Sequence, residues 1–193
     1  LKQLPFINQF GYQKTSIARP DSFPVKVSGY LSIYHSINGK VEWMIDDSLH
    51  HLSPGHTIIV LPHQLLGSPK QVLEIGGFCW IQIAQDYIQK RNATNNENWA
   101  DKKNDQGSIR KIVYNNTNPV IKQFKEAGKI FSIIHEELSQ RQMGYKAMVH
   151  HQLDNLLIKL ARCILQQNPP PREFPPSLKT LETMLHQNPS YQW

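Results

Sequence analysis

The side-chain periodicity of this 193-residue chain changes once, close to Asn118, and that change limits the folds open to it. Residues 29–85 hold short runs of strand-forming residues between turn signals, the strongest of which is Asn38-Gly39. After Asn118 the apolar residues recur every three or four positions, as they do on one face of a helix. The sequence therefore predicts an α+β protein with its strands first and its helices last.

The strand-forming half reads as a set of short β-strands. Turn signals stand at Asn38-Gly39, at Asp46-Asp47 and at Ser53-Pro54-Gly55. Short strands at this spacing favour a small sandwich or barrel over alternating strands and helices. Within the polar stretch 86–117 we expect one late strand, at residues 109–114. The other predicted strands cover residues 30–34, 41–45, 57–61, 71–75 and 78–83.

The helical half, residues 118–168, reads as two helices separated by Gly144. Asn118 and Pro119 are suited to cap and begin the first helix. The second helix has an apolar face wider than one partner helix needs. That face either packs on the barrel and on the first helix or pairs with a second copy of the chain, and its opposite edges can do both.

The last part of the chain is expected to connect to something further. Residues 169–176 are rich in proline and read as a stiff linker. In residues 177–193, Ser177 can cap a short helix whose apolar face carries Leu178, Leu181 and Leu185. Because one amphipathic helix cannot bury its own apolar face, we expect this segment to open a second domain.

Composition and motifs exclude several classes of function. The net charge of +6 is dispersed and does not by itself predict contact with DNA. No window approaches 18 uninterrupted apolar residues, so no membrane segment is expected. Cys79 and Cys163 lie in apolar patterns and are expected to be free thiols, with a disulfide as the alternative; free thiols fit a cytoplasmic protein.

The sequence gives no sign of catalysis or of a metal site. Two histidines spaced by one residue would face the same side of a strand, but the chain has only the adjacent pair His50-His51. It has no Gly-x-Ser-x-Gly elbow, no phosphate-cradling loop and no zinc-type spacing. We therefore expect no enzyme, no catalytic residue, no metal and no cofactor.

One strand carries a pattern suited to a small polar ligand. Phe78, Trp80 and Gln82 alternate and so share one face, whereas the residues between them are apolar. An indole ring can cover an apolar ligand face while an amide two residues away bonds a hydroxyl. The alternative is that Trp80 belongs to the core. Tyr30 and Tyr34 bracket another strand in a similar way.

The order of these motifs resembles a known family. Gly11-Tyr12 precedes the strands, residues 52–62 follow the Gly39 turn, and a tryptophan-bearing strand at residues 79–83 comes next. A helix pair with Gly144-Tyr145 at its turn follows, and then residues 178–193. Over nearly its whole length the chain resembles the sensing half of bacterial transcription regulators of the arabinose-regulator (AraC/XylS) family.

The resemblance implies a fold and a division into parts. Residues 1–117 would form an N-terminal arm and a cupin-like β-barrel, that is, a double-stranded jelly roll that binds an effector. Residues 118–168 would form an antiparallel helical hairpin for dimerisation, and residues 169–176 the linker. Residues 177–193 would be the truncated start of a helix-turn-helix DNA-binding domain.

The resemblance also implies partners and site residues. A sugar or related small effector would bind in the barrel, a homodimer would form through the helix pair, and the missing C-terminal domain would bind DNA. The expected ligand-binding residues are Trp80, Gln82, Phe78, Tyr30, Tyr34 and Arg19. The expected dimer seam consists of Leu153, Leu156, Leu160 and Ile164.

Two other readings of the sequence remain. The first is a cupin-type metalloenzyme, an isomerase or a dioxygenase, which would need a metal that the histidine spacing does not supply. The second is a pure interaction module whose barrel is filled by its own side chains.

Overall fold

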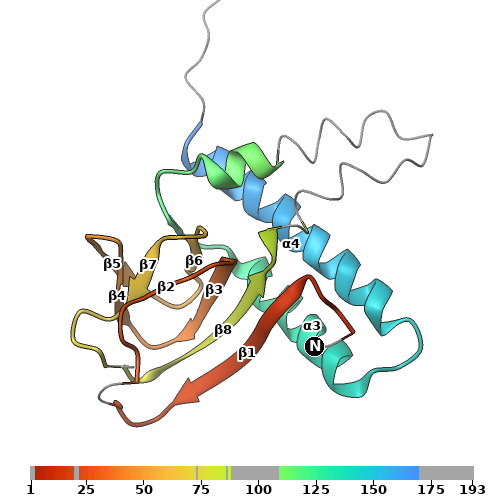
Figure 1. Ribbon diagram of the computed structural model, residues 1–193, viewed down its shortest axis with the longest axis horizontal. Helices are drawn as coiled ribbons and strands as arrows, with labels where there is room; N and C mark the ends of the chain where they lie inside the picture. The colour runs from red at the N-terminus through yellow and green to blue at the C-terminus, as the bar shows by residue number, and fades with distance from the viewer. Residues whose placement is uncertain (1–2, 20–21, 73, 86, 88–108, 170–193) are drawn as a thin grey trace, which may run out of the picture.

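The computed structural model describes residues 3–19, 22–72, 74–85, 87 and 109–169. The described strands form two antiparallel sheets, and helices cover one side of the larger sheet (Figure 1). The larger sheet has the strand order β1 (Ile7–Thr15), β8 (Gly76–Ile83), β3 (Leu31–Asn38), β6 (Thr57–Val60), β9 (Val120–Ile121). The smaller sheet has the order β2 (Lys26–Val27), β7 (Leu65–Gly67), β4 (Val41–Ile45), β5 (Ser48–Leu52).

The predicted α+β class is confirmed, but the predicted closed barrel is not. Among the described residues the strands remain in two separate sheets, with no ladder that joins them into one. Asn38-Gly39, the strongest hairpin signal in the sequence, forms a turn but no hairpin, because it leads the chain from β3 in the larger sheet to β4 in the smaller one and these two strands do not pair. Gly39 has a φ of 81°, a left-handed conformation that a glycine adopts without strain.

The larger sheet separates two hydrophobic cores because side chains alternate along its strands. On one face, Cys79, Ile81 and Ile83 of β8 pack with the helices. On the other face, Phe78 and Trp80 of the same strand pack between the two sheets. The predicted division of this strand into two faces is therefore confirmed.

Helices α3 (Lys125–Gln140) and α4 (Tyr145–Gln167) form the predicted hairpin. Gly144 separates them with a φ of 86°. The wide apolar face of α4 packs on the larger sheet and on α3. This is the first of the two alternatives that the sequence left open for this face. Leu153, Leu156 and Leu160 are 0% exposed, and Ile164 is also buried, so these four side chains lie in the core of a single chain.

Three local predictions are wrong. Residues 109–114 are helical, and the described residues of 71–75 form no strand. Asn118 and Pro119 do not begin a helix, because the next two residues form β9 and pair with Thr57 and Ile58 of β6. Helix α3 begins only at Lys125. Pairing with a distant strand therefore overrides the local capping signal.

The N-terminal arm is mostly a strand that the sequence did not predict. β1 pairs along its length with β8 and forms one edge of the larger sheet. Gly11 lies opposite Trp80, and a Cβ atom added at Gly11 would overlap the Trp80 indole. The indole thus lies directly against the β1 backbone, which only a glycine permits.

The remaining expectations concern the end of the chain, membrane-spanning helices and the two cysteines. The helix-turn-helix start at residues 177–193, and all of the linker beyond Pro169, lie outside the described residues. Within the described part, no helix is long and apolar enough to cross a bilayer. Cys79 and Cys163 are both free, as expected.

His35 is a buried titratable group in the core beneath α3. Its Nδ1 lies 2.9 Å from Thr57 Oγ1, and its ring lies nearly parallel to that of Phe131. Gly128 of α3 leaves room for the imidazole, because an added Cβ would lie 3.3 Å from His35 Nε2. Burial lowers the pKa of His35 from 6.5 to about 4, so the neutral ring is the folded form.

This lowered pKa predicts a loss of stability in acid. The unfolded chain binds a proton near pH 6.5 and the folded chain only near pH 4, so the His35 contribution is complete above pH 6.5 and falls away as the pH drops toward 4. Between pH 7 and pH 4.5 the wild-type free energy of unfolding should drop by about 2–3 kcal/mol more than that of His35→Gln. Urea unfolding of both proteins at both pH values measures this, and equal drops would contradict it.

The Gly11 contact predicts a second stability effect. Gly11→Ala should lower the free energy of unfolding by about 1–3 kcal/mol, because the methyl group displaces the Trp80 ring. Gly29→Ala is the matched control, since nothing lies within 4 Å of a Cβ at that position. Denaturant unfolding should separate the two variants, and a neutral Gly11→Ala would show that Trp80 moves without cost.

Candidate functional site

Five aromatic rings, called here the aromatic cluster, lie between the two sheets. The Trp43 ring is central, and its centroid lies 4.9 Å from Phe23, 5.2 Å from Tyr34 and 5.3 Å from Phe78. Trp80 completes the cluster at 5.5 Å from Phe78 and 6.5 Å from Tyr34. The cluster forms because alternation along β3, β4 and β8 turns Tyr34, Trp43 and the pair Phe78 and Trp80 toward the same space, where Phe23 joins them.

A row of polar side chains borders the cluster beside Tyr34. This row, called here the polar edge, consists of Asn8, Ser28, Ser32 and Gln82. The Tyr34 hydroxyl lies near Gln82 and Ser32. Gln82 Oε1 accepts a hydrogen bond of 2.8 Å from Asn8 Nδ2, and Ser28 Oγ lies 3.1 Å from Ser32 Oγ. Burial raises the pKa of Tyr34 above its ordinary value, and hydrogen bonding to the Gln82 and Ser32 side chains lowers it in part. The Tyr34 hydroxyl is therefore a neutral group at physiological pH.

A β-bulge positions Asn8 at the polar edge. The register of β1 against β8 shifts between Ile7 and Gln9, which leaves Asn8 as the extra residue. A bulge of this kind re-aims a side chain at a sheet edge. Here it brings the Asn8 amide to Gln82, on the strand next to β1.

The structure brings four of the six predicted ligand-binding residues together. Phe78, Trp80 and Tyr34 belong to the aromatic cluster, and Gln82 belongs to the polar edge. Tyr30 is half-buried just before β3, and its carbonyl oxygen accepts a bond from Ser28 Oγ.

Arg19 is the predicted site residue that stands apart. It is exposed beyond the end of β1. Among the described residues no hydrogen bond or ring contact joins its side chain to the aromatic cluster or to the polar edge. Whether it meets a ligand stays a prediction.

Sequence reasoning missed two parts of this arrangement. Trp43 was not singled out, although it alternates with Val41 and Ile45 in a predicted strand and so had to face inward. Asn8 carried no signal, because neither the strand β1 nor its bulge can be recognised from local sequence. The contact between Asn8 and Gln82 depends on residues 74 positions apart.

The aromatic cluster is buried at its centre. Trp43 is 1% exposed and Phe78 is 7% exposed. The two hollows described below, of about 300 Å³ and about 290 Å³, lie away from these rings. Trp80, Tyr34 and Gln82 are half-buried, so a ligand could contact the cluster where these three reach the polar edge.

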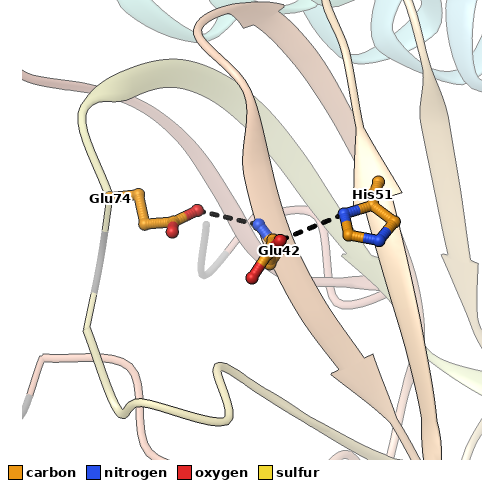
Figure 2. Close-up of polar contacts among 3 residues, drawn as sticks. All are labelled: Glu42, His51 and Glu74. Atoms are coloured by element: carbon orange, nitrogen blue, oxygen red, sulfur yellow. Dashed lines mark hydrogen bonds and ion pairs between the residues drawn. The ribbon is translucent and has the colours of Figure 1, made fainter.

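A separate hollow of about 300 Å³ lies on the smaller sheet beside Lys40 and Lys70, and its lining includes the three residues drawn in Figure 2. There His51 Nδ1 lies 3.2 Å from Glu42 Oε1, and Glu74 Oε2 accepts a bond of 2.8 Å from the Glu42 backbone N–H. The His51–Glu42 pair is exposed to solvent, so it contributes little to stability. Within the described residues no group of three or more His, Cys, Asp or Glu side chains is arranged to hold a metal ion.

Comparison with known proteins gives only distant structural likenesses. No family model and no curated protein matches the chain. Similar solved structures include the AraC-like transcriptional activator CuxR, at 9% identity over 93% of this chain and 70% of that chain, with a TM-score of 0.40. Apo ToxT from Vibrio cholerae is 10% identical over 95% of this chain and 66% of that chain, with a TM-score of 0.38.

A further likeness is to the EutQ protein of Clostridium difficile, at 16% identity over 44% of this chain, with a TM-score of 0.33. The chain spans 62% of the length of that protein. At this level of similarity, the family and function of the chain have to be argued from its own residues.

Proposed function

We propose that this chain is the ligand-sensing part of a DNA-binding transcription regulator of the AraC/XylS type. A small polar effector, with sugars as the expected class, would bind where the aromatic cluster meets the polar edge. The observation that carries this proposal is the half-buried Trp80 ring, which lies beside the Tyr34 ring and on the same strand face as Gln82, whose side chain bonds Asn8. The order of sequence motifs supports the choice of family.

The chemistry of this edge suits a carbohydrate. The Trp80 indole offers an apolar surface for the C–H face of a sugar ring. Gln82 and Asn8 carry amide groups that can both donate and accept, and Tyr34 adds a hydroxyl. The hydroxyl groups of a bound sugar would replace hydrogen bonds that these side chains now make with one another. Neither the side chains nor the sugar hydroxyls would then be left unpaired.

The segment that carries Asn8 also contacts α4, which gives a route from effector to helices. The Phe6 ring lies 4.6 Å from the Tyr87 ring and 4.0 Å from the His150 ring of α4. Gln3 Oε1 accepts a bond of 2.7 Å from the Tyr145 hydroxyl at the start of α4. An effector that draws Asn8 to itself would therefore pull on a segment already attached to the helix.

Gating by this segment sets an energetic requirement. An effector must bind one arrangement of the segment better than another, and moving a 1:99 balance to 99:1 takes about 5.5 kcal/mol of differential affinity. Each hydrogen bond or stacked ring contributes about 1 kcal/mol, so the contacts at the polar edge can supply only a part of this free energy. The switch would therefore also require a change in the contacts that Phe6 and Gln3 make with Tyr87 and with α4.

We also propose a homodimer through α4, with a seam displaced from the four residues expected from the sequence. Because Leu153, Leu156, Leu160 and Ile164 are buried in the single chain, a second copy would meet the opposite side of the helix. On that side Met148 and Ile158 are 41% and 37% exposed. The seam would consist of Met148, His151, Asn155 and Ile158, which follow the three- and four-residue spacing of paired helices.

The reader of DNA is proposed to follow the linker, beginning in residues 177–193. In this proposal the chain is no enzyme, needs no cofactor and acts in the cytoplasm. The metalloenzyme alternative requires a stoichiometric transition metal, which elemental analysis of the purified protein detects. Such a metal would overturn the regulator proposal.

A second candidate function has one observation in its favour. Trp43 and Phe78 are buried between the sheets, as expected for an interaction module whose sheets bind no small molecule. The titration described next distinguishes the two, because a filled module binds none of the sugars.

The effector proposal predicts a binding pattern. Titration calorimetry with L-arabinose, D-galactose, D-glucose and D-fructose should show binding of at least one sugar. Gln82→Ala should weaken that binding about five- to tenfold through the lost hydrogen bond, and Trp80→Ala should weaken it further. Gln140→Ala, on the exposed surface of α3, is the control and should bind as the wild type does. Wild-type affinity in Gln82→Ala would place the site elsewhere.

The dimer proposal predicts that Ile158→Asp weakens self-association. A carboxylate at the seam should raise the dimer dissociation constant at least about tenfold, because it would be desolvated opposite its own copy. Val27→Asp, at an exposed apolar position on the smaller sheet, is the control and should dimerise normally. Sedimentation equilibrium measures both, and a wild type that stays monomeric at high concentration would remove the proposal.

A further inference from the structure

A groove of about 290 Å³ lies where the helical residues at 109–114 meet the last turn of α4. Ile112, Ile164 and Leu165 form its apolar floor, and Asn116 and Asn168 belong to its polar rim. Leu165 is 41% exposed, although it lies in a hollow beside two other apolar side chains. The groove therefore offers apolar surface that the described residues leave uncovered.

Hydrogen bonds fix the end of α4 beside this groove. Gln167 Nε2 donates 2.8 Å to the carbonyl oxygen of Lys122, and Gln167 Oε1 accepts 3.2 Å from the Lys122 backbone N–H. Asn168 Nδ2 donates 3.3 Å to Asn116 Oδ1. Since Lys122 directly follows β9, the point at which the chain leaves α4 is attached to the larger sheet.

The chain that follows carries an apolar face without an assigned partner. Leu178, Leu181 and Leu185 share one side of the helix predicted from the sequence. Nine residues separate Asn168 from Leu178, and as an extended proline-type chain these ten steps span about 30 Å. The linker is therefore long enough for the leucine face to reach the groove, whose rim includes Asn168 itself.

We propose that residues 178–185 dock their leucine face into this groove and so hold the segment after the linker against the sensing part of the chain. Docking requires the chain to reverse direction, and residues 172–174 interrupt the prolines at the middle of the linker. Glu182 in the docking segment and Lys111 in the groove lining carry opposite charges, which favours this docking. This proposal goes beyond effector binding and does not depend on it.

Proteolysis of the full chain tests the groove side. In the docked chain, trypsin should cut slowly after Lys179, because its site lies within the bound segment. Leu165→Gln should speed this cut about fivefold or more by replacing apolar groove surface with an amide. Leu49→Gln is the matched control, since Leu49 is also an exposed leucine but lies on β5, and its cut should keep the wild-type rate.

Hydrogen exchange tests the segment side. Leu181→Ser combined with Leu185→Ser should raise amide exchange in residues 111–117, whereas Lys179→Ser combined with Thr183→Ser, on the opposite side of the segment, should not. Unchanged exchange together with an unchanged trypsin rate in Leu165→Gln would overturn the proposal. Protection of the groove that grows with protein concentration would also overturn it, because the occupant would then be a second copy.

Discussion

The ladder between β3 and β8 is the interaction on which the rest of the protein depends. These strands pair from Leu31 with Ile83 to Asn38 with Gly77, and both faces of the pair are covered. One face binds the helices and the other binds the smaller sheet. Because side chains alternate along each strand, a slip of one residue would send Trp80 toward the helices and Ile81 toward the aromatic cluster. One register thus specifies both cores at once.

This ladder also assembles the polar edge. Ser32 lies opposite Gln82 and Tyr34 lies opposite Trp80, so the residues of the candidate site are cross-strand neighbours. β1 adds Asn8 from the other side of β8. The site is therefore a product of strand pairing, and its geometry depends on the same backbone bonds that hold the core.

Local patterns predicted much of the fold where local physics decides it. Gly39 and Gly144 marked turns that need a left-handed backbone, and the alternation in residues 78–83 gave the correct two faces. Local patterns failed where a distant partner decides. Residues 120–121 became β9 because β6 was available, and the supposed arm became β1 because β8 was available.

The candidate site shows the same division. Trp80 and Gln82 could be selected from one strand because their spacing places them on one face. Their contact with Tyr34 and with Asn8 could not be foreseen, since it requires the order of strands in the sheet. The width of the apolar face on α4 was visible in the sequence, but only the packed structure shows that Leu153 and Leu156 belong to the interior and that Ile158 faces outward.

The two cysteines sit at different depths in this architecture. Cys79 lies in the central ladder, where burial raises the pKa of its thiol to about 12. The reactive thiolate is therefore absent while β8 is paired with its neighbouring strands. Cys163 lies half-buried on α4. An alkylating reagent would thus modify Cys163 first and reach Cys79 only after β8 separates from its neighbours. The rate at which Cys79 is alkylated would therefore report how often β8 separates from its neighbouring strands.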